Sequence, residues 1–145
     1  MKLLDLNLLI FAVNRDSAPH RAARAWLEDL LSGEETVALP WVVTLGFLRL
    51  TTNPRVVTRP LTPEQAMGVV DGWLARPAVV ALNPTDEHWP ILRELLGASG
   101  SAGNLTTDAH LAALAIEHGA ELCSADGDFA RFARLRLSNP LMPDV

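Results

Sequence analysis

Four aspartates have the residue type and the positions to form one chemical site. Asp5 follows a short apolar run at the N-terminus, and Asp108 opens an apolar pattern of helical spacing. Asp126 and Asp128 follow a second short apolar run near the C-terminus. Carboxylates that gather within a few ångströms repel one another unless a cation neutralises them. The pattern therefore predicts a site for a hard divalent cation.

The cation would bring hydrolytic chemistry with it. Mg²⁺ and Mn²⁺ favour carboxylate and water oxygens, and a water held by Mg²⁺ can attack a phosphodiester. Each aspartate also has an ordinary structural explanation: Asp5 as a helix cap, Asp108 as an acid at a helix N-terminus, and Asp126 as a turn residue. Their coincidence at one sheet edge is less common than any of these alone, so we treat them as candidate ligands.

Strand and helix patterns alternate along the chain and would position these acids. The expected strands are 2–5, 36–39, 78–82, 121–124 and a last one near 135–137. The expected helices are one after Asp5, 18–32 with Ser17 as N-cap, one that follows Pro40 and stops before Asn53, 63–74, one capped by Thr85 that carries Trp89 to Leu96, 109–118, and a short one with the turn at 126–128. The small-residue segment 97–103 is expected to be a loop.

This alternation predicts a three-layer α/β/α fold with a central, mainly parallel sheet. At 145 residues we expect one domain, 1–145. Ligands bind such sheets beyond the carboxyl ends of the strands, so Asp5 and Asp126 should face the same edge. Asp108 joins them if the N-terminus of its helix opens there.

Composition supports a folded, intracellular protein. Hydrophobic residues make up 49% of the chain and charged residues 20%. Asp5 interrupts the N-terminal apolar stretch and no 18-residue apolar run follows, so we expect a cytoplasmic protein without a membrane span. The single cysteine, Cys123, excludes an intrachain disulfide and is expected to be a buried thiol.

The net charge of −5 is unusual for a protein that handles nucleic acid, because phosphate contacts need cations. Eleven of the twelve basic residues are Arg, the residue that binds phosphate in a bidentate way, although codon bias explains this equally well. The four tryptophans are expected mostly to pack on apolar helix faces, with base stacking by one of them as an alternative.

Three motifs, in order and spacing, resemble the PIN domains of VapC toxins. They are Leu4-Asp5-Leu6-Asn7, Thr107-Asp108-Ala109-His110-Leu111-Ala112-Ala113-Leu114-Ala115 and Ser124-Ala125-Asp126-Gly127-Asp128-Phe129. The resemblance covers nearly the whole chain. It implies a PIN-like fold and an Mg²⁺-dependent endoribonuclease, with Mn²⁺ as a substitute, that acts as the toxin of a toxin–antitoxin pair.

The resemblance also assigns roles to residues. It implies that Asp5, Asp108 and Asp126 are catalytic metal ligands with Asp128 as a fourth acid. A supporting set, Asn7, Thr107 and Ser124, would orient the ligands by hydrogen bonds. Many PIN domains carry a Glu on the third helix, but 44–49 contains no acid. We therefore expect one tightly held ion, with Asp128 or the substrate phosphate helping to hold any second.

Other residues receive alternatives rather than assignments. Arg49 is expected either to contact a substrate phosphate or to pair with one of the acids. His110 lies two positions after Asp108, on a different helical face, so we expect a core or surface role and no catalytic one. The expected partners are an RNA substrate and a VapB-like antitoxin, which the resemblance implies would insert a cationic segment, and we expect a homodimer.

Two other functions fit parts of the pattern. An Asp-based phosphatase would place Asp-x-Asp at the first strand, where Asn7 takes the second position, and a receiver domain would need a Lys that only Lys2 could supply. A catalytically impaired PIN-like module that binds RNA or protein is favoured by the missing Glu and the negative charge. Three acids that repel one another argue against pure binding.

Overall fold

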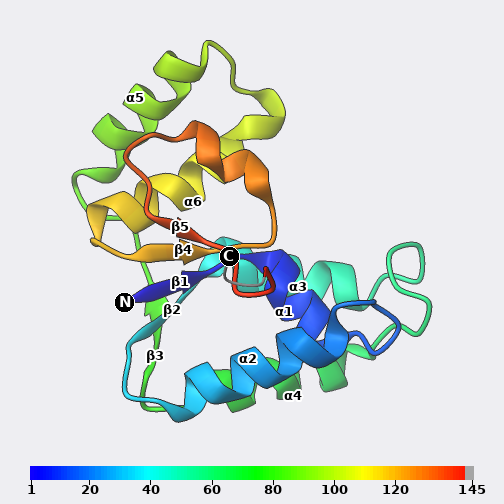
Figure 1. The fold of residues 1–145 in the computed structure, drawn as a ribbon. Coiled ribbons are helices and arrows are strands. Elements are labelled where there is room, and N and C mark those ends of the chain that lie inside the picture. The colour runs from blue at the N-terminus through cyan, green and yellow to red at the C-terminus, as the bar shows by residue number, and fades with distance from the viewer. Residues whose placement is uncertain (143–145) are drawn as a thin grey trace.

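The chain folds around one sheet of five parallel strands (Figure 1). The computed structural model describes residues 1–142, so residues 143–145 of the expected domain lie outside the described part. The strands are β1 (Lys2–Leu4), β2 (Val37–Pro40), β3 (Val79–Leu82), β4 (Glu121–Cys123) and β5 (Leu137–Ser138). Their order across the sheet is β3-β2-β1-β4-β5. The predicted parallel sheet is confirmed.

Six α-helices connect the strands and form two groups. They are α1 (Leu6–Val13), α2 (His20–Ser32), α3 (Trp41–Thr51), α4 (Pro63–Leu74), α5 (His88–Ser99) and α6 (Thr106–Glu117), with short 3₁₀ helices η1 (Gly103–Leu105) and η2 (Gly127–Arg131). Helices α1 to α4 pack on one another, and α5 packs on α6. Figure 1 shows the α5–α6 pair on one side of the strands and α2 with α4 on the other. The three-layer α/β/α fold is confirmed.

The layering follows from the direction in which the chain crosses the sheet. From β1 the chain moves outward to β2 and β3, and it then returns past β1 to β4 and β5. Crossovers between parallel strands are right-handed, so connections that run in opposite directions place their helices on opposite faces. The central strand is covered on both faces, which explains why Leu3 and Leu4 are both buried.

Two predicted helix starts are wrong. The second helix begins at His20 rather than at 18, and the Ser17 hydroxyl donates to the Asn14 carbonyl oxygen (2.9 Å) instead of capping it. The fifth helix begins at His88, and the Thr85 hydroxyl accepts from the Glu87 N–H (3.2 Å) in the turn before it. In both places the side chain stabilises a turn, a local competition common for Ser and Thr.

The segment predicted as a loop at 97–103 is also shorter than expected. Helix α5 continues to Ser99 and ends at Gly100, whose φ of 66° lies in the left-handed region that favours glycine. Helix α6 begins at Thr106, three residues before the predicted start. Strand β5 is Leu137–Ser138 rather than 135–137. The acidic residue Asp108 therefore lies in the first turn of α6.

Burial separates the tryptophans into two kinds. Trp73 is buried and packs edge-on against Phe47, with ring centroids 4.8 Å apart. Trp41 and Trp89 are exposed, which corrects the expectation of packing for these two. Cys123 is buried and free, as predicted.

Among the described residues, no helix combines the length and the apolar character that crossing a membrane requires.

Candidate acidic site at the switch point of the sheet

The candidate acids gather where the strand order changes direction. Strand β1 pairs with β2 on one side and with β4 on the other, so the chain leaves β1 in both directions across the sheet. Asp5 follows β1 directly, and Asp126 lies just beyond β4. The carboxyl edge at such a switch point is where open α/β sheets bind ligands.

Asp5 is held by the start of α1 and by β4. Its backbone N–H donates to the Cys123 carbonyl (3.0 Å), which continues the β1–β4 ladder. One carboxylate oxygen accepts from the Leu6 N–H (2.7 Å), and the other accepts from the Ser124 hydroxyl (2.7 Å). Burial raises the pKa of Asp5 and the nearby Asp126 charge raises it further, although these two hydrogen bonds lower it.

Ser124 connects the acids to each other. Its side chain is buried, and its hydroxyl oxygen accepts from the Asp126 N–H (2.9 Å) while it donates to Asp5. Asn7 supports this contact from α1, because its amide donates to the Ser124 hydroxyl and its carbonyl oxygen accepts from the Ala125 N–H, both at 3.3 Å. Two residues of the supporting set therefore hold the chain that carries Asp126 against Asp5.

Asp126 begins the short helix η2. Its Oδ1 accepts from the Asp128 N–H (2.9 Å), so it acts as the N-cap of that helix. The Asp126 residue is half-buried and Asp128 is exposed. The turn role predicted for Asp126 and a ligand role are therefore compatible, and the cap role predicted for Asp5 is confirmed at the start of α1.

Asp108 reaches the same electrostatic neighbourhood from the first turn of α6. Burial raises its pKa first, and the charges of Asp5, Asp126 and Asp128 raise it further, while Arg131 lowers it. Asp108 is thus near enough to Asp5, Asp126 and Asp128 for their charges to raise its pKa, and the ligand roles of the four acids stay predictions.

Thr107 and Arg49 stand apart from this network. Thr107 is exposed, and its side chain makes no hydrogen bond within residues 1–142. Arg49 is exposed on α3 and forms no ion pair with an acid in the same part of the chain. The roles expected for both residues stay predictions.

The donor set fits a hard divalent cation in its chemistry. All four candidate ligands offer carboxylate oxygens, and the pKa of Asp108 is raised first by burial and then by the charges of the other three acids, which a cation would offset. Over the described part of the chain, however, no three His, Cys, Asp or Glu side chains are arranged closely enough to hold a metal ion. Helix α3 contributes no acid.

A histidine pair lies on the α5–α6 interface, apart from the acids. His88 Nε2 is 2.9 Å from His110 Nδ1, and His88 Nδ1 is 2.8 Å from Glu117, whose side chain is fully buried. Burial and the proximity of His88 lower the pKa of His110. His110 therefore helps to join two helices, in agreement with the structural role expected for it.

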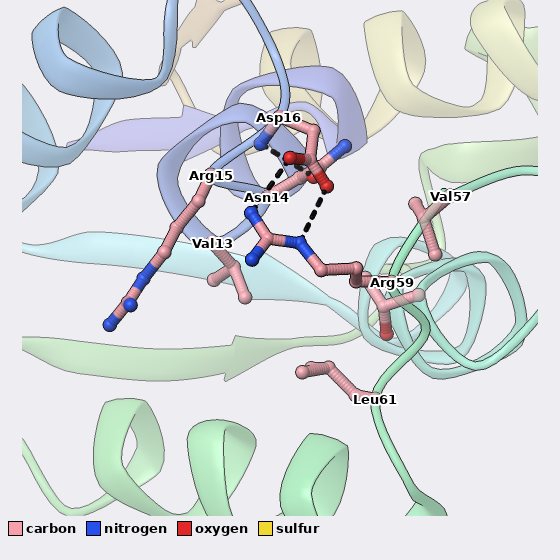
Figure 2. Close-up of a pocket in the computed structure, with 8 residues that line it drawn as sticks. Val13, Asn14, Arg15, Asp16, Val57, Arg59 and Leu61 are labelled. Atoms are coloured by element: carbon pink, nitrogen blue, oxygen red, sulfur yellow. Dashed lines mark hydrogen bonds and ion pairs between the residues drawn. The ribbon is translucent and has the colours of Figure 1, made fainter.

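A hollow of about 340 Å³ lies between the end of α1 and the segment that follows α3 (Figure 2). Arg59 spans it and bonds both carboxylate oxygens of Asp16, at 2.7 and 3.1 Å. Arg15 lines the same hollow, and Figure 2 shows its side chain directed away from this pair. None of the four candidate acids lines this hollow, so it is separate from the acidic site.

Sequence reasoning gave no role to Arg131 or to Gly46. Arg131 ends η2 and acts on Asp108, a placement that its spacing of three from Asp128 could have suggested. Gly46 on α3 lies so close to α1 that a Cβ there would meet Leu6 Cδ2 at 2.7 Å. No sequence pattern reports such a close approach between helices.

The fold and the site together define an α/β domain that carries a cluster of carboxylates, suited to a divalent cation, at the switch point of its sheet. The model of the PIN domain family matches residues 2–135. The chain belongs to the PIN domain family, in its VapC branch. The expected family resemblance is thereby confirmed.

Close relatives extend over almost the full chain. Ribonuclease VapC37 of Mycobacterium tuberculosis is 45% identical over 140 residues, which are 97% of this chain and 97% of that protein. Ribonuclease VapC43 of the same species is 43% identical over 141 residues, 97% of this chain and 96% of that protein.

Solved structures share the fold. One is VapBC2 of Rickettsia felis bound to a DNA fragment from its promoter, with a TM-score of 0.70 and 21% identity over 95% of this chain and 97% of that one. Another is DNA-bound VapBC of Salmonella typhimurium, with a TM-score of 0.68 and 18% identity over 96% of this chain and 97% of that one.

Proposed function

We propose that this chain, a single PIN domain, is a metal-dependent endoribonuclease that hydrolyses RNA phosphodiesters as the toxin of a toxin–antitoxin pair. The observation that carries the proposal is the joining of Asp5 and Asp126 by the Ser124 hydroxyl at the sheet's switch point, with Asp108 close enough for their charges to raise its pKa. Its VapC relatives are named ribonucleases, which supports the reaction class. RNA hydrolysis by a toxin of this kind takes place in the cytoplasm, where we place the protein.

The proposed cofactor is Mg²⁺, for which Mn²⁺ can substitute. Asp5, Asp108 and Asp126 would hold it as ligands, with Asp128 as a fourth acid. A bound Mg²⁺ supplies an activated water and neutralises charge on the phosphate. Because α3 carries no acid, we propose one tightly held ion.

The protein's own residues orient the proposed metal ligands. Ser124 and the Leu6 N–H fix the Asp5 carboxylate in one orientation. Asn7 holds the loop that carries Asp126. Ligands oriented in this way lose less freedom when the ion and the substrate bind, which is how supporting hydrogen bonds raise affinity and rate.

The proposed partner is a VapB-like antitoxin. The similar solved structures are VapBC assemblies, which supports a partner for this chain as well. An edge with four acids and a single nearby arginine is electrostatically suited to a cationic segment of that partner. Such a segment would block the site by occupying the position of the cation and the RNA.

The second candidate is a PIN-like module that binds RNA or protein without cleavage. It is favoured by the absence, within residues 1–142, of a group of side chains already arranged to hold a metal ion. This candidate predicts binding that is indifferent to metal and no fragments under any condition.

Cleavage of labelled total bacterial RNA by the purified protein separates the two candidates. We expect discrete fragments with Mg²⁺ or Mn²⁺, none with EDTA, and recovery when Mg²⁺ is restored in excess. A folded protein that gives no fragments with either metal, or the same fragments with EDTA, would contradict the proposed function.

A further inference from the structure

A basic side chain, that of Arg131, lies at the acidic edge, where it could bind the RNA substrate. Arg131 ends η2, the short helix that Asp126 caps and that contains Asp128. Its Nε donates to the Asp128 carbonyl oxygen (3.1 Å), which anchors the base of the guanidinium beside the acids. The side chain is exposed, and its two terminal nitrogens have no hydrogen bond within residues 1–142.

A hollow of about 400 Å³ begins at Arg131. Leu95 and Ala98 of α5 line one wall, and the segment 131–134 lines the other. Its volume lies within the range of roughly 300–1,000 Å³ that is usual for small-molecule sites. The hollow thus has mixed walls, in which Leu95 and Ala98 lie with the Glu94–Arg134 ion pair, and the Arg131 guanidinium lies at its edge.

The neighbouring arginines are already engaged. Arg134, which also lines the hollow, pairs with Glu94 (3.0 Å), and Arg136 donates to the Gly119 carbonyl. Within residues 1–142, Arg131 is therefore the arginine of this segment whose terminal nitrogens are available for an anion.

We propose that Arg131 binds the RNA phosphate adjacent to the scissile one, and that the nucleotide beyond this phosphate, on the side away from the acids, enters the hollow between α5 and residues 131–134. The inference rests on the proposed ribonuclease function and names a binding residue for it. A protein of net charge −5 repels RNA at long range, so local cations must hold the backbone. The planar guanidinium is suited to do so because it binds phosphate oxygens in a bidentate way.

The test is the salt dependence of cleavage kinetics for wild type, Arg131→Ala and Arg131→Lys, on a labelled RNA fragment that wild type cuts. Arg21→Ala is the matched control, because Arg21 is an exposed arginine on α2, on the opposite side of the sheet. Thermal unfolding of each variant verifies that the substitution has not disturbed the fold.

We expect Arg131→Ala to raise KM roughly ten-fold or more, with kcat changed far less, because a charge-assisted contact to bound substrate is lost. The slope of log(kcat/KM) against log[KCl] should become shallower by about 0.7 to 1, the value of one phosphate contact. Arg131→Lys should restore the slope and only part of the affinity, and Arg21→Ala should behave as wild type.

Two results would overturn the inference. One is an Arg131→Ala enzyme whose KM and salt slope match those of Arg21→Ala. The other is a fall in kcat with the salt slope unchanged, which would mean that Arg131 only supports the Asp128 loop. A wild-type protein that cuts no RNA would instead contradict the proposed function and remove the basis of the inference with it.

Discussion

At the scale of single residues, Ser124 connects two acids of the site by hydrogen bonds. It bonds Asp5 through its hydroxyl hydrogen and the Asp126 N–H through its oxygen, in a buried position. Without that hydroxyl the buried Asp5 carboxylate would lose an oriented donor, and the part-buried Asp126 N–H would lose its acceptor. An oxygen on one small side chain thus links the ends of β1 and β4.

We expect Ser124→Ala to lower cleavage by roughly 10–100-fold, the usual effect of losing a residue that orients metal ligands. The free energy of unfolding should fall by about 1–3 kcal/mol because buried polar groups are left unpaired. Single-turnover rates and urea unfolding measure the two effects. Ser101→Ala, in an exposed position, is the control, and equal behaviour of the two variants would refute the role given to Ser124.

The raised pKa of Asp108 makes stability depend on pH in a definite direction. A carboxyl whose pKa is raised by folding binds a proton more tightly in the folded than in the unfolded state, so its charge destabilises the fold above the folded pKa. This destabilisation fades as the pH falls through the folded pKa and is gone below the unfolded value of about 3.9.

In EDTA at pH 7, Asp108→Asn should therefore be more stable than wild type. The difference should shrink as the pH is lowered toward about 4, and Mg²⁺ at pH 7 should reduce it too. Urea unfolding across pH gives the difference in free energy. A wild type that is the more stable protein at pH 7 without metal would show that the acids do not repel one another.

The sequence anticipated some of these residues for a physical reason and missed others. Asp5 and Asp126 could be predicted because residues after parallel strands meet at one sheet edge. The availability of Arg131 for an anion could not be predicted, because it depends on which neighbouring arginines are already paired, as Arg134 is with Glu94. Thr107 received a supporting role only because it precedes Asp108 in a motif of the resemblance. Its side chain makes no hydrogen bond within residues 1–142.

At the scale of elements, the contact between α1 and α3 positions the acidic edge. Gly46 allows α3 to approach Leu6, the residue whose N–H bonds Asp5. The types and order of the elements were predictable from apolar periodicity and from Pro and Gly. Their ends were less so, because Ser17 and Thr85 stabilise turns where an N-cap was expected.

Gly46→Ala should crowd the end of the half-buried Leu6 side chain, which must shift to admit the added Cβ. We expect a net loss of stability of about 1 kcal/mol or less, because the shift of that side chain and a gain in helix propensity of about 1 kcal/mol offset much of the overpacking. The control is Gly68→Ala on α4, where an added Cβ meets nothing within 4 Å, and which should gain about 0.5–1 kcal/mol. If both variants gain stability, the α1–α3 approach is not tight.

At the scale of the whole molecule, exposed apolar side chains bear on assembly. Trp41 and Leu45 lie one turn apart on α3 and are 48% and 60% exposed, and Trp89 on α5 is 65% exposed. Large apolar side chains that remain exposed together are more typical of an interaction surface than of a monomer's exterior. The homodimer expected from the sequence stays a prediction.

Light scattering tests this prediction. We expect twice the chain mass of 15.7 kDa for the wild type and the single-chain mass for Leu45→Glu, whose charge would be buried in the interface. A wild type with the mass of one chain would refute the homodimer.

The central claim is that the acids of the sheet edge carry out metal-dependent RNA cleavage, and one comparison tests it most directly. Single-turnover cleavage in Mg²⁺ is measured for wild type, Asp126→Asn and Asp29→Asn, the last an exposed aspartate on α2 that removes the same charge. We predict that Asp126→Asn loses activity by on the order of 100-fold or more, since a ligand is removed, while Asp29→Asn matches wild type. Equal rates for all three folded proteins would contradict the account.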